Sequence, residues 1–144
     1  MKIPEYVTKD EVRRVCRELD LRDWTQIKEG QITDQEAETI LGLVNSEKMN
    51  IPLEEFVQGL EVELEHGTRF ADANITNNHP LLTGKIVLAH LKEAMDYYER
   101  ILVAELEGDL LKAIRAKNIS KVEDKYKKLA AARKTLSQAE LAQL

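Results

Sequence analysis

The chain contains the same helix-starting pattern twice, 25 residues apart, as V-T-K-D-E at 7–11 and I-T-D-Q-E at 32–36. In each copy the threonine hydroxyl can accept from the first free backbone amides, and the glutamate three residues later can reach back to the cap. Apolar residues then recur at i, i+3, i+4 and i+7 in both copies. The pattern predicts two similar short helices, over about 9–20 and 34–46.

Proline and glycine mark the helices that follow. Pro52 suits a first helical turn, where its missing N–H would be unpaired anyway, and Gly67 suits a left-handed C-cap. Pro80 then opens a long fourth helix, from 81 to about 107, that is apolar on most sides. Gly108 then indicates a break at the end of this fourth helix. A polar loop separates the third helix from the fourth.

Charge divides the chain into two parts. Residues 1–108 carry 12 Lys+Arg against 22 Asp+Glu, a net of −10, whereas residues 109–144 carry 9 against 4, a net of +5. We therefore expect an all-α protein with a compact acidic body of short N-terminal helices and a long central helix, over 1–107. A basic amphipathic helical extension, over 108–144, follows it.

The basic tail has its own helix start, at Ser120 with Glu123, another capping box. Its apolar residues form a narrow seam of the kind that lies along another helix. Two interpretations remain: the tail folds back on its own body, or it docks on a partner or a second copy. The candidate docking residues are Val122, Tyr126, Leu129 and Leu136.

Several classes of protein are disfavoured. One cysteine, Cys16, allows no disulfide within the chain, and we expect it in the core. No apolar run approaches the roughly 18 residues of a membrane span, and no hydrophobic signal region is seen, so a cytoplasmic protein is expected. An acidic body disfavours nucleic acid as a partner. Phosphate-binding glycine loops and nucleophile elbows are absent.

Acids and histidines gather on the third and fourth helices. Glu63 and His66 are three residues apart, as are His90 and Glu93, so each pair shares one helix face. The face that carries His90 and Glu93 is otherwise apolar, which predicts that both are turned toward the core.

Buried charge is costly unless it is paired or bound to metal, which leaves several interpretations open. The groups could form a closed hydrogen-bond network. They could instead bind zinc, iron or manganese through His66, His90 and Glu93, with Glu63 or Glu65 and also His79 as further ligands. A catalytic dyad is the third interpretation.

Three strings support a family resemblance: E-L-E-H-G at 63–67, T-G-K-I-V-L-A-H-L-K-E at 83–93 and D-Y-Y at 96–98. Over about residues 32–103 the chain resembles a family of small bacterial and bacteriophage proteins that is known only as a domain of unknown function. The resemblance leaves the first repeat copy and the tail outside the family. It implies that the following residues belong to a family signature: Glu65, His66, Asn74, Thr76, His90, Glu93, Asp96 and Tyr97.

The resemblance also implies that the polar loop packs over the two helices and joins their polar groups, with Asn74, Thr76, Asp96 and Tyr97 in one network. It implies no activity. Occurrence among phage proteins favours a virion or assembly role, and a place in the virion if the chain is phage-encoded.

The leading hypothesis is a non-enzymatic structural or interaction protein that acts through helix-mediated docking on another protein or on a second copy. The competing hypothesis is a metal-binding protein or metal-dependent enzyme that uses the Glu/His cluster.

Overall fold

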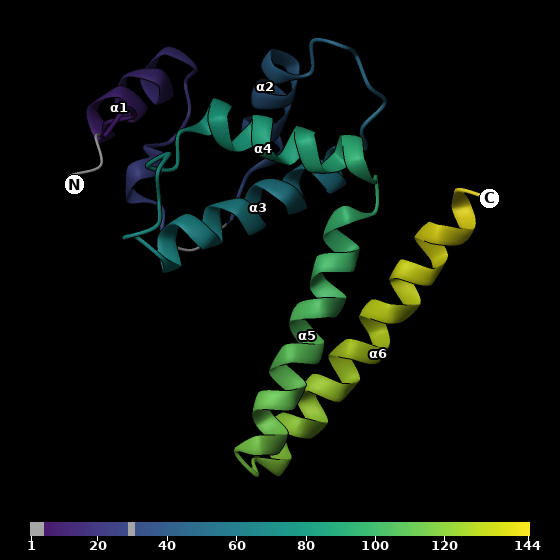
Figure 1. Cartoon of the computed structure of the whole chain (residues 1–144). Coiled ribbons are helices and arrows are strands. Elements are labelled where there is room, and N and C mark those ends of the chain that lie inside the picture. The colour runs from purple at the N-terminus through teal and green to yellow at the C-terminus, as the bar shows by residue number, and fades with distance from the viewer. Residues whose placement is uncertain (1–4, 29–30) are drawn as a thin grey trace. The chain divides into compact units, whose positions relative to one another are not determined.

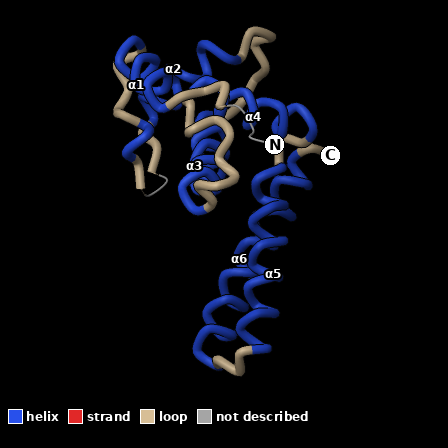
Figure 2. Tube along the Cα trace, turned by 60° about the vertical axis from the view of Figure 1, so that its left-hand side comes forward, coloured by secondary structure: helices blue, strands red, loops and turns tan. Residues whose placement is uncertain are grey.

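A computed structural model describes residues 5–28 and 31–144, which contain six α-helices, one short 3-10 helix and no strand (Figures 1 and 2). This confirms the all-α prediction. The elements, in chain order, are α1 (Lys9–Glu18), η1 (Trp24–Gln26), α2 (Asp34–Val44), α3 (Leu53–Arg69), α4 (Pro80–Glu93), α5 (Tyr97–Arg115) and α6 (Ile119–Ala142).

The two repeated helix starts are confirmed, but only the second is a complete capping box. In α2, Glu36 N donates to Thr33 Oγ1 at 3.2 Å and Thr33 N donates to Glu36 Oε2 at 3.1 Å. In α1, Thr8 accepts from Glu11 N at 3.2 Å. The Glu11 carboxylate binds Arg14 instead, which replaces the second half of the box.

The predicted single helix over 81–107 is wrong. Ala94 is extended, with φ −154° and ψ 129°, and this separates α4 from α5. Gly108 lies inside α5 and breaks nothing. Gly67 likewise lies inside α3, which continues to Arg69, so a left-handed cap at Gly67 is also wrong.

The helices form two compact units, Met1–Met95 and Asp96–Leu144, which we call unit 1 and unit 2. The helix joined to the tail is therefore α5, most of which belongs to the segment predicted as body. The assignment of domains to 1–107 and 108–144 remains a prediction.

In unit 1, α4 packs against both α2 and α3, and α1 packs against η1 and α4 (Figure 1). Gly84 permits the close approach of α4 to α2, because a Cβ there would lie 2.5 Å from Ile40 Cγ2. The expected burial of Cys16 is confirmed. The most deeply buried apolar side chains are those of Val12, Cys16, Trp24, Ala37, Ile40, Phe56, Leu60, Leu64 and Val87.

Unit 2 is an antiparallel hairpin of α5 and α6, which lie side by side in both views (Figures 1 and 2). The turn is a Schellman motif: Lys117 N donates to Ile114 O at 2.9 Å and Asn118 N donates to Ala113 O at 3.1 Å. Lys117 has the required positive φ, 53°. The N-cap of α6 is Asn118, which accepts from Lys121 N at 3.1 Å, so the predicted capping box at Ser120 is wrong.

The seam of the tail packs on α5 of the same chain. Leu129 is buried with Leu106 and Ala132, and Val103 and Leu110 of α5 complete the cluster. Of the four predicted docking residues, Leu129 is buried, Val122 and Leu136 are half-buried, and only Tyr126 is exposed. The buried part of the seam therefore contacts α5 rather than a second molecule.

Candidate functional sites

The first candidate site is a glutamate between two histidines, which we call the Glu/His cluster. Glu63 of α3 places Oε1 3.2 Å from Nδ1 of His90 on α4, and its Oε2 lies 3.9 Å from Nδ1 of His66. The Glu63 side chain is only 16% exposed, compared with 28% for His90 and 48% for His66. The carboxylate thus links α3 to α4 inside unit 1.

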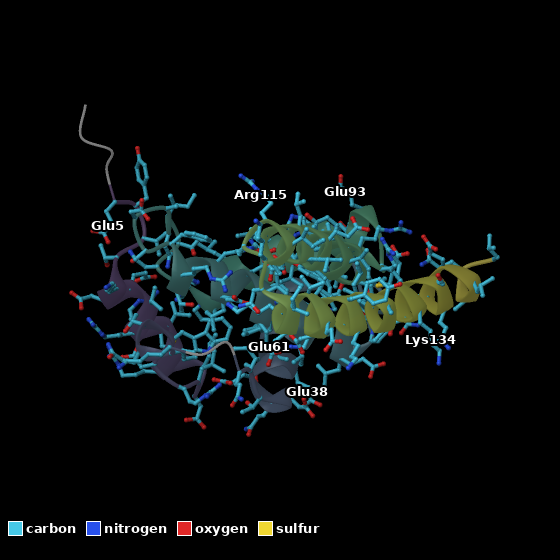
Figure 3. All side chains as sticks on the ribbon, turned by 90° about the horizontal axis from the view of Figure 1, so that it is seen from below. Glu5, Glu38, Glu61, Glu93, Arg115 and Lys134 are labelled. Carbon is cyan, nitrogen blue, oxygen red and sulfur yellow. The ribbon has the colours of Figure 1, made fainter. Side chains whose placement is uncertain are left out.

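The other three predicted metal ligands lie elsewhere. Glu65 is exposed and forms an ion pair with Arg69 at 2.7 Å. Glu93 is exposed too, and its side chain projects away from the ribbon (Figure 3), so the predicted core-facing orientation of Glu93 is wrong. His79 is buried and caps α4, because its Nδ1 accepts from Leu82 N at 3.4 Å. Burial lowers the pKa of His79, which favours the neutral ring that this acceptor role needs.

Across residues 5–28 and 31–144, no group of three or more His, Cys, Asp or Glu side chains is arranged to hold a metal ion. Three of the six predicted ligands, Glu63, His66 and His90, are brought together, but as pairs around one carboxylate. The geometry is that of hydrogen-bonded or ion-paired groups, and binding of zinc, iron or manganese remains a prediction without a supporting arrangement.

Beside the Glu/His cluster, the polar loop is fastened to the end of α3. Asn74 Nδ2 donates to Gly67 O at 3.0 Å and to Asn78 Oδ1 at 2.7 Å, and Thr76 Oγ1 donates to Asn74 Oδ1 at 3.3 Å. A Cβ on Gly67 would lie 2.1 Å from Asn78 Oδ1, so only glycine allows this approach. We call this arrangement the asparagine clamp.

The clamp and the cluster line one pocket of about 230 Å³, whose walls include Glu63, His66, Phe70, Asn74, Thr76 and Ile86. The loop therefore packs on α3, as the resemblance implied. The other two members of the expected network have partners in unit 2. Asp96 accepts from Arg100 Nε at 2.9 Å and Nη2 at 2.7 Å, and the Tyr97 ring stacks edge-on against Tyr98.

A buried cluster around Glu36 was not foreseen. Arg22 Nη2 lies 2.5 Å from Glu36 Oε2, and Trp24 Nε1 donates to Oε1 at 3.2 Å. Burial alone would raise the pKa of Glu36, but hydrogen bonds from Arg22, Thr33 and Trp24 outweigh it and lower the pKa to about 2. The only signal in the sequence was the presence of an arginine and the single tryptophan between the two repeats.

The second candidate site is an edge of the hairpin in unit 2. One side of the hairpin is marked by the ion pair of Glu107 with Arg133, at 2.6 Å. Leu111 and Ile114 follow Glu107 by four and seven residues, so they lie on the same side of α5 as Glu107. Tyr126 and Ile119 precede Arg133 by seven and fourteen residues, so they lie near the same side of α6 as Arg133. We call Leu111, Ile114, Tyr126 and Ile119 the apolar edge.

The opposite side of the hairpin is charged. Lys125 Nζ lies 2.8 Å from Asp109 Oδ2, and Lys112 Nζ lies 3.1 Å from Oδ1 of the same residue. Hydrogen bonds from these two lysines lower the pKa of Asp109. With Lys121, these residues line a hollow of about 520 Å³. We call Asp109, Lys112, Lys121 and Lys125 the charged edge. The two sides of one hairpin therefore differ sharply in chemistry.

The described helices include none that is both long enough and apolar enough to cross a membrane. The described residues form an all-α protein whose first unit contains the asparagine clamp and the Glu36 cluster and whose second unit is a helical hairpin.

The chain belongs to a family of proteins of unknown function, DUF5661, whose model matches residues 12–107. The match begins within α1, so the expectation that the family part starts at about residue 32 is wrong. The first helix-starting pattern, at 7–11, lies before the match, whereas most of the helix that follows it lies within the match. It ends within α5, and α6 and the apolar edge lie beyond it. No curated protein and no solved structure is significantly similar to this chain.

Proposed function

We propose that this chain is a non-enzymatic interaction protein that docks on a protein partner through the apolar edge of the α5–α6 hairpin. The observation that carries the proposal is the exposure of four large apolar side chains on one side of the hairpin. The exposed fractions are 58% for Leu111, 53% for Ile114, 72% for Ile119 and 61% for Tyr126.

The four exposed side chains of the apolar edge supply only a limited binding free energy. Complete burial of one such side chain is worth about 1.5–3 kcal/mol, so covering the exposed parts of all four is worth on the order of 5 kcal/mol. Association itself costs about 4–15 kcal/mol. The apolar edge can therefore hold a partner only if further contacts contribute.

Charge on the rest of the hairpin supplies that contribution. Residues 109–144 carry nine Lys and Arg against four Asp and Glu. Arg115 and Lys134 extend away from the ribbon (Figure 3), where a partner could pair with them. A partner with an apolar centre and an acidic rim fits this surface. The bacteriophage members implied by the resemblance favour an assembly setting for such docking.

The test is photo-crosslinking from the apolar edge. A photo-reactive amino acid is placed at Tyr126, and a matched variant carries it at Lys112 on the charged edge, where the native side chain is also exposed. Illumination in extracts of cells that naturally contain the chain should give a discrete adduct from position 126 and none from 112. The adduct is identified by mass spectrometry and rebuilt from two purified proteins.

Two results would refute the proposal. Equal adducts from both edges would show contact without specificity. No adduct from either, with the purified chain also failing to associate with itself, would leave the apolar edge without a binding role.

A further inference from the structure

We infer that the partner of the apolar edge is a second copy of this chain, and that the edge binds in the groove between the N-terminal ends of α2 and α3 in unit 1 of that copy. This inference rests on the proposed function and adds the identity of the partner and the surface it offers.

The receiving groove combines an apolar floor with an acidic rim. It has a volume of about 630 Å³ and is lined by Asp34, Pro52, Leu53, Glu54, Val57, Gln58 and Glu61. Three of these seven side chains are carboxylates and none is basic. Leu53 and Val57 are only half-buried, so they remain able to contact apolar groups of a second molecule.

The acidic rim continues along α3 beyond the groove. Glu54, Gln58, Glu61 and Glu65 follow one another at four-, three- and four-residue steps, which places them in one stripe. A second hollow shares Gln58 and Glu61 with the groove and extends it to Glu65 and Thr68, and the basic side chain of Lys28 also lines this hollow. The Glu65 charge is paired with Arg69 and Lys28 lies beside Glu61 in the second hollow, so the uncompensated negative charge of the stripe is mainly at Glu54.

The charges of the two surfaces are complementary. The groove has a net negative lining. Residues 109–144 have a net charge of +5, of which the charged edge accounts for +2, so the rest of the segment keeps a net charge of +3. Opposite charge both steers encounter and disfavours wrong partners, including groove against groove and hairpin against hairpin. An apolar floor under an acidic rim is the surface that the proposed function requires of the partner.

The two surfaces also agree in length. At 1.5 Å per helical residue, the stripe from Glu54 to Glu65 is about 16 Å long. The edge along α6, from Ile119 to Arg133, is about 21 Å long by the same rise. One side of α6 can therefore lie along α3 over three helical turns, with Ile119 and Tyr126 above the floor.

Because groove and edge are different surfaces, each copy offers one of each. Such a heterologous contact joins copies head to tail, and it closes only if the rotation between successive copies permits a ring. This geometry predicts that two variants with different surfaces disabled will associate when mixed, a result that a symmetric dimer formed by edge against edge would not give.

The experiment uses two variants of the full chain, each with one surface disabled. The groove variant is Glu54→Lys with Gln58→Lys, and the edge variant is Ile119→Glu with Tyr126→Glu. All four positions are exposed or half-buried, and circular dichroism checks that both variants keep the helical fold. Lys112→Gln with Lys121→Gln changes the net charge by the same −2 as the edge variant, but on the charged edge.

Molar mass by light scattering at low salt gives the readout. We expect the wild type and the lysine control to exceed the 16.5 kDa of one chain as concentration rises. Each single-surface variant should remain at 16.5 kDa by itself. An equimolar mixture should give a pair of 2 × 16.5 = 33 kDa and nothing larger, because each pair has one good edge in one good groove. Salt should weaken the pair, since the Debye length shrinks from about 10 Å at 0.1 M to about 3 Å at 1 M.

Two outcomes would overturn the inference, and they separate it from the proposed function. If the groove variant still associates and the edge variant does not, the edge binds another surface, and the proposed function stands without this partner site. If the wild type remains monomeric up to about 1 mM, where a free energy of about −4 kcal/mol would be detected, the partner is not a second copy. The crosslinking at Tyr126 then decides the proposed function independently.

Discussion

Protonation of Glu36 should remove a defined part of the stability of unit 1. The carboxylate is 4% exposed and holds Arg22, Trp24 and the Thr33 backbone together. Its pKa is lowered from 4.5 to about 2. A group whose pKa is depressed on folding stabilises the protein above its unfolded pKa, and that contribution is lost as pH falls toward the folded pKa. The window is therefore between about pH 4.5 and pH 2.

The size of the effect follows from the shift. A difference of about 2.5 pKa units at 1.36 kcal/mol per unit is about 3.4 kcal/mol at most. Arg22, the strongest partner, is half exposed and its charge is screened by solvent, so we expect about 2 kcal/mol. That is a large fraction of the 5–15 kcal/mol typical of a folded domain.

The assay is urea unfolding followed by the fluorescence of Trp24, the single tryptophan, which is fully buried in unit 1. Glu36→Gln keeps the shape but cannot take up or release this proton. Between pH 5 and pH 2, the wild type should lose about 2 kcal/mol more of its free energy of unfolding than Glu36→Gln does. Glu38→Gln, on an exposed position of the same helix, should behave as the wild type.

Equal losses in the wild type and in Glu36→Gln over this pH range would refute the reasoning, because the titration of Glu36 would then contribute nothing. Circular dichroism on the same samples shows whether the fluorescence change is unfolding, since Trp24 donates directly to the carboxylate.

The other predictions concern local geometry. Gly108→Ala should stabilise the protein by about 0.5–1 kcal/mol, because a Cβ there meets nothing within 4 Å in mid-helix. The same change at Gly67 should cost about 1–3 kcal/mol, because the Cβ would displace the asparagine clamp. Lys117→Gly should raise the melting temperature by removing a positive φ from a side-chain-bearing residue, worth about 1 kcal/mol; an unchanged value would contradict the Schellman assignment. Leu129→Ala should destabilise the hairpin by about 2–5 kcal/mol in urea unfolding followed by circular dichroism, and a cost under about 1 kcal/mol would argue against its packing on α5.

The starts of α1, α2 and α4 were predictable because their causes are local. The threonine caps of α1 and α2 and the proline at the start of α4 act through backbone groups within four residues. Those bonds form whatever the rest of the chain does. The apolar spacing of the tail was also predictable, since a seam is a property of one helix.

The break between α4 and α5 was not predictable by such rules. Residues 94–96 are Ala, Met and Asp, which include neither proline nor glycine, and the apolar pattern continues across them. The chain nevertheless turns at an extended Ala94. Propensity is a weak signal that tertiary packing overrides.

The candidate sites show the same division between local and tertiary causes. Spacing placed Glu63 with His66 and His90 with Glu93, but only packing decided that Glu63 meets His90 while Glu93 faces outward. A spacing of three residues predicts that two side chains share one face of a helix. Which other helix packs on that face depends on the tertiary structure.

By itself, the sequence of this protein determined an all-helical chain, the positions of its first helix starts and a basic amphipathic tail. Only the tertiary structure decided that the tail packs on α5, which leaves an apolar edge on one side of the hairpin and a charged edge on the opposite side. It also decided the opposite roles of two glycines, since Gly67 faces the asparagine clamp and Gly108 faces open space. The physical reason is that capping and periodicity act within a few residues, whereas burial depends on atoms that are distant in the chain.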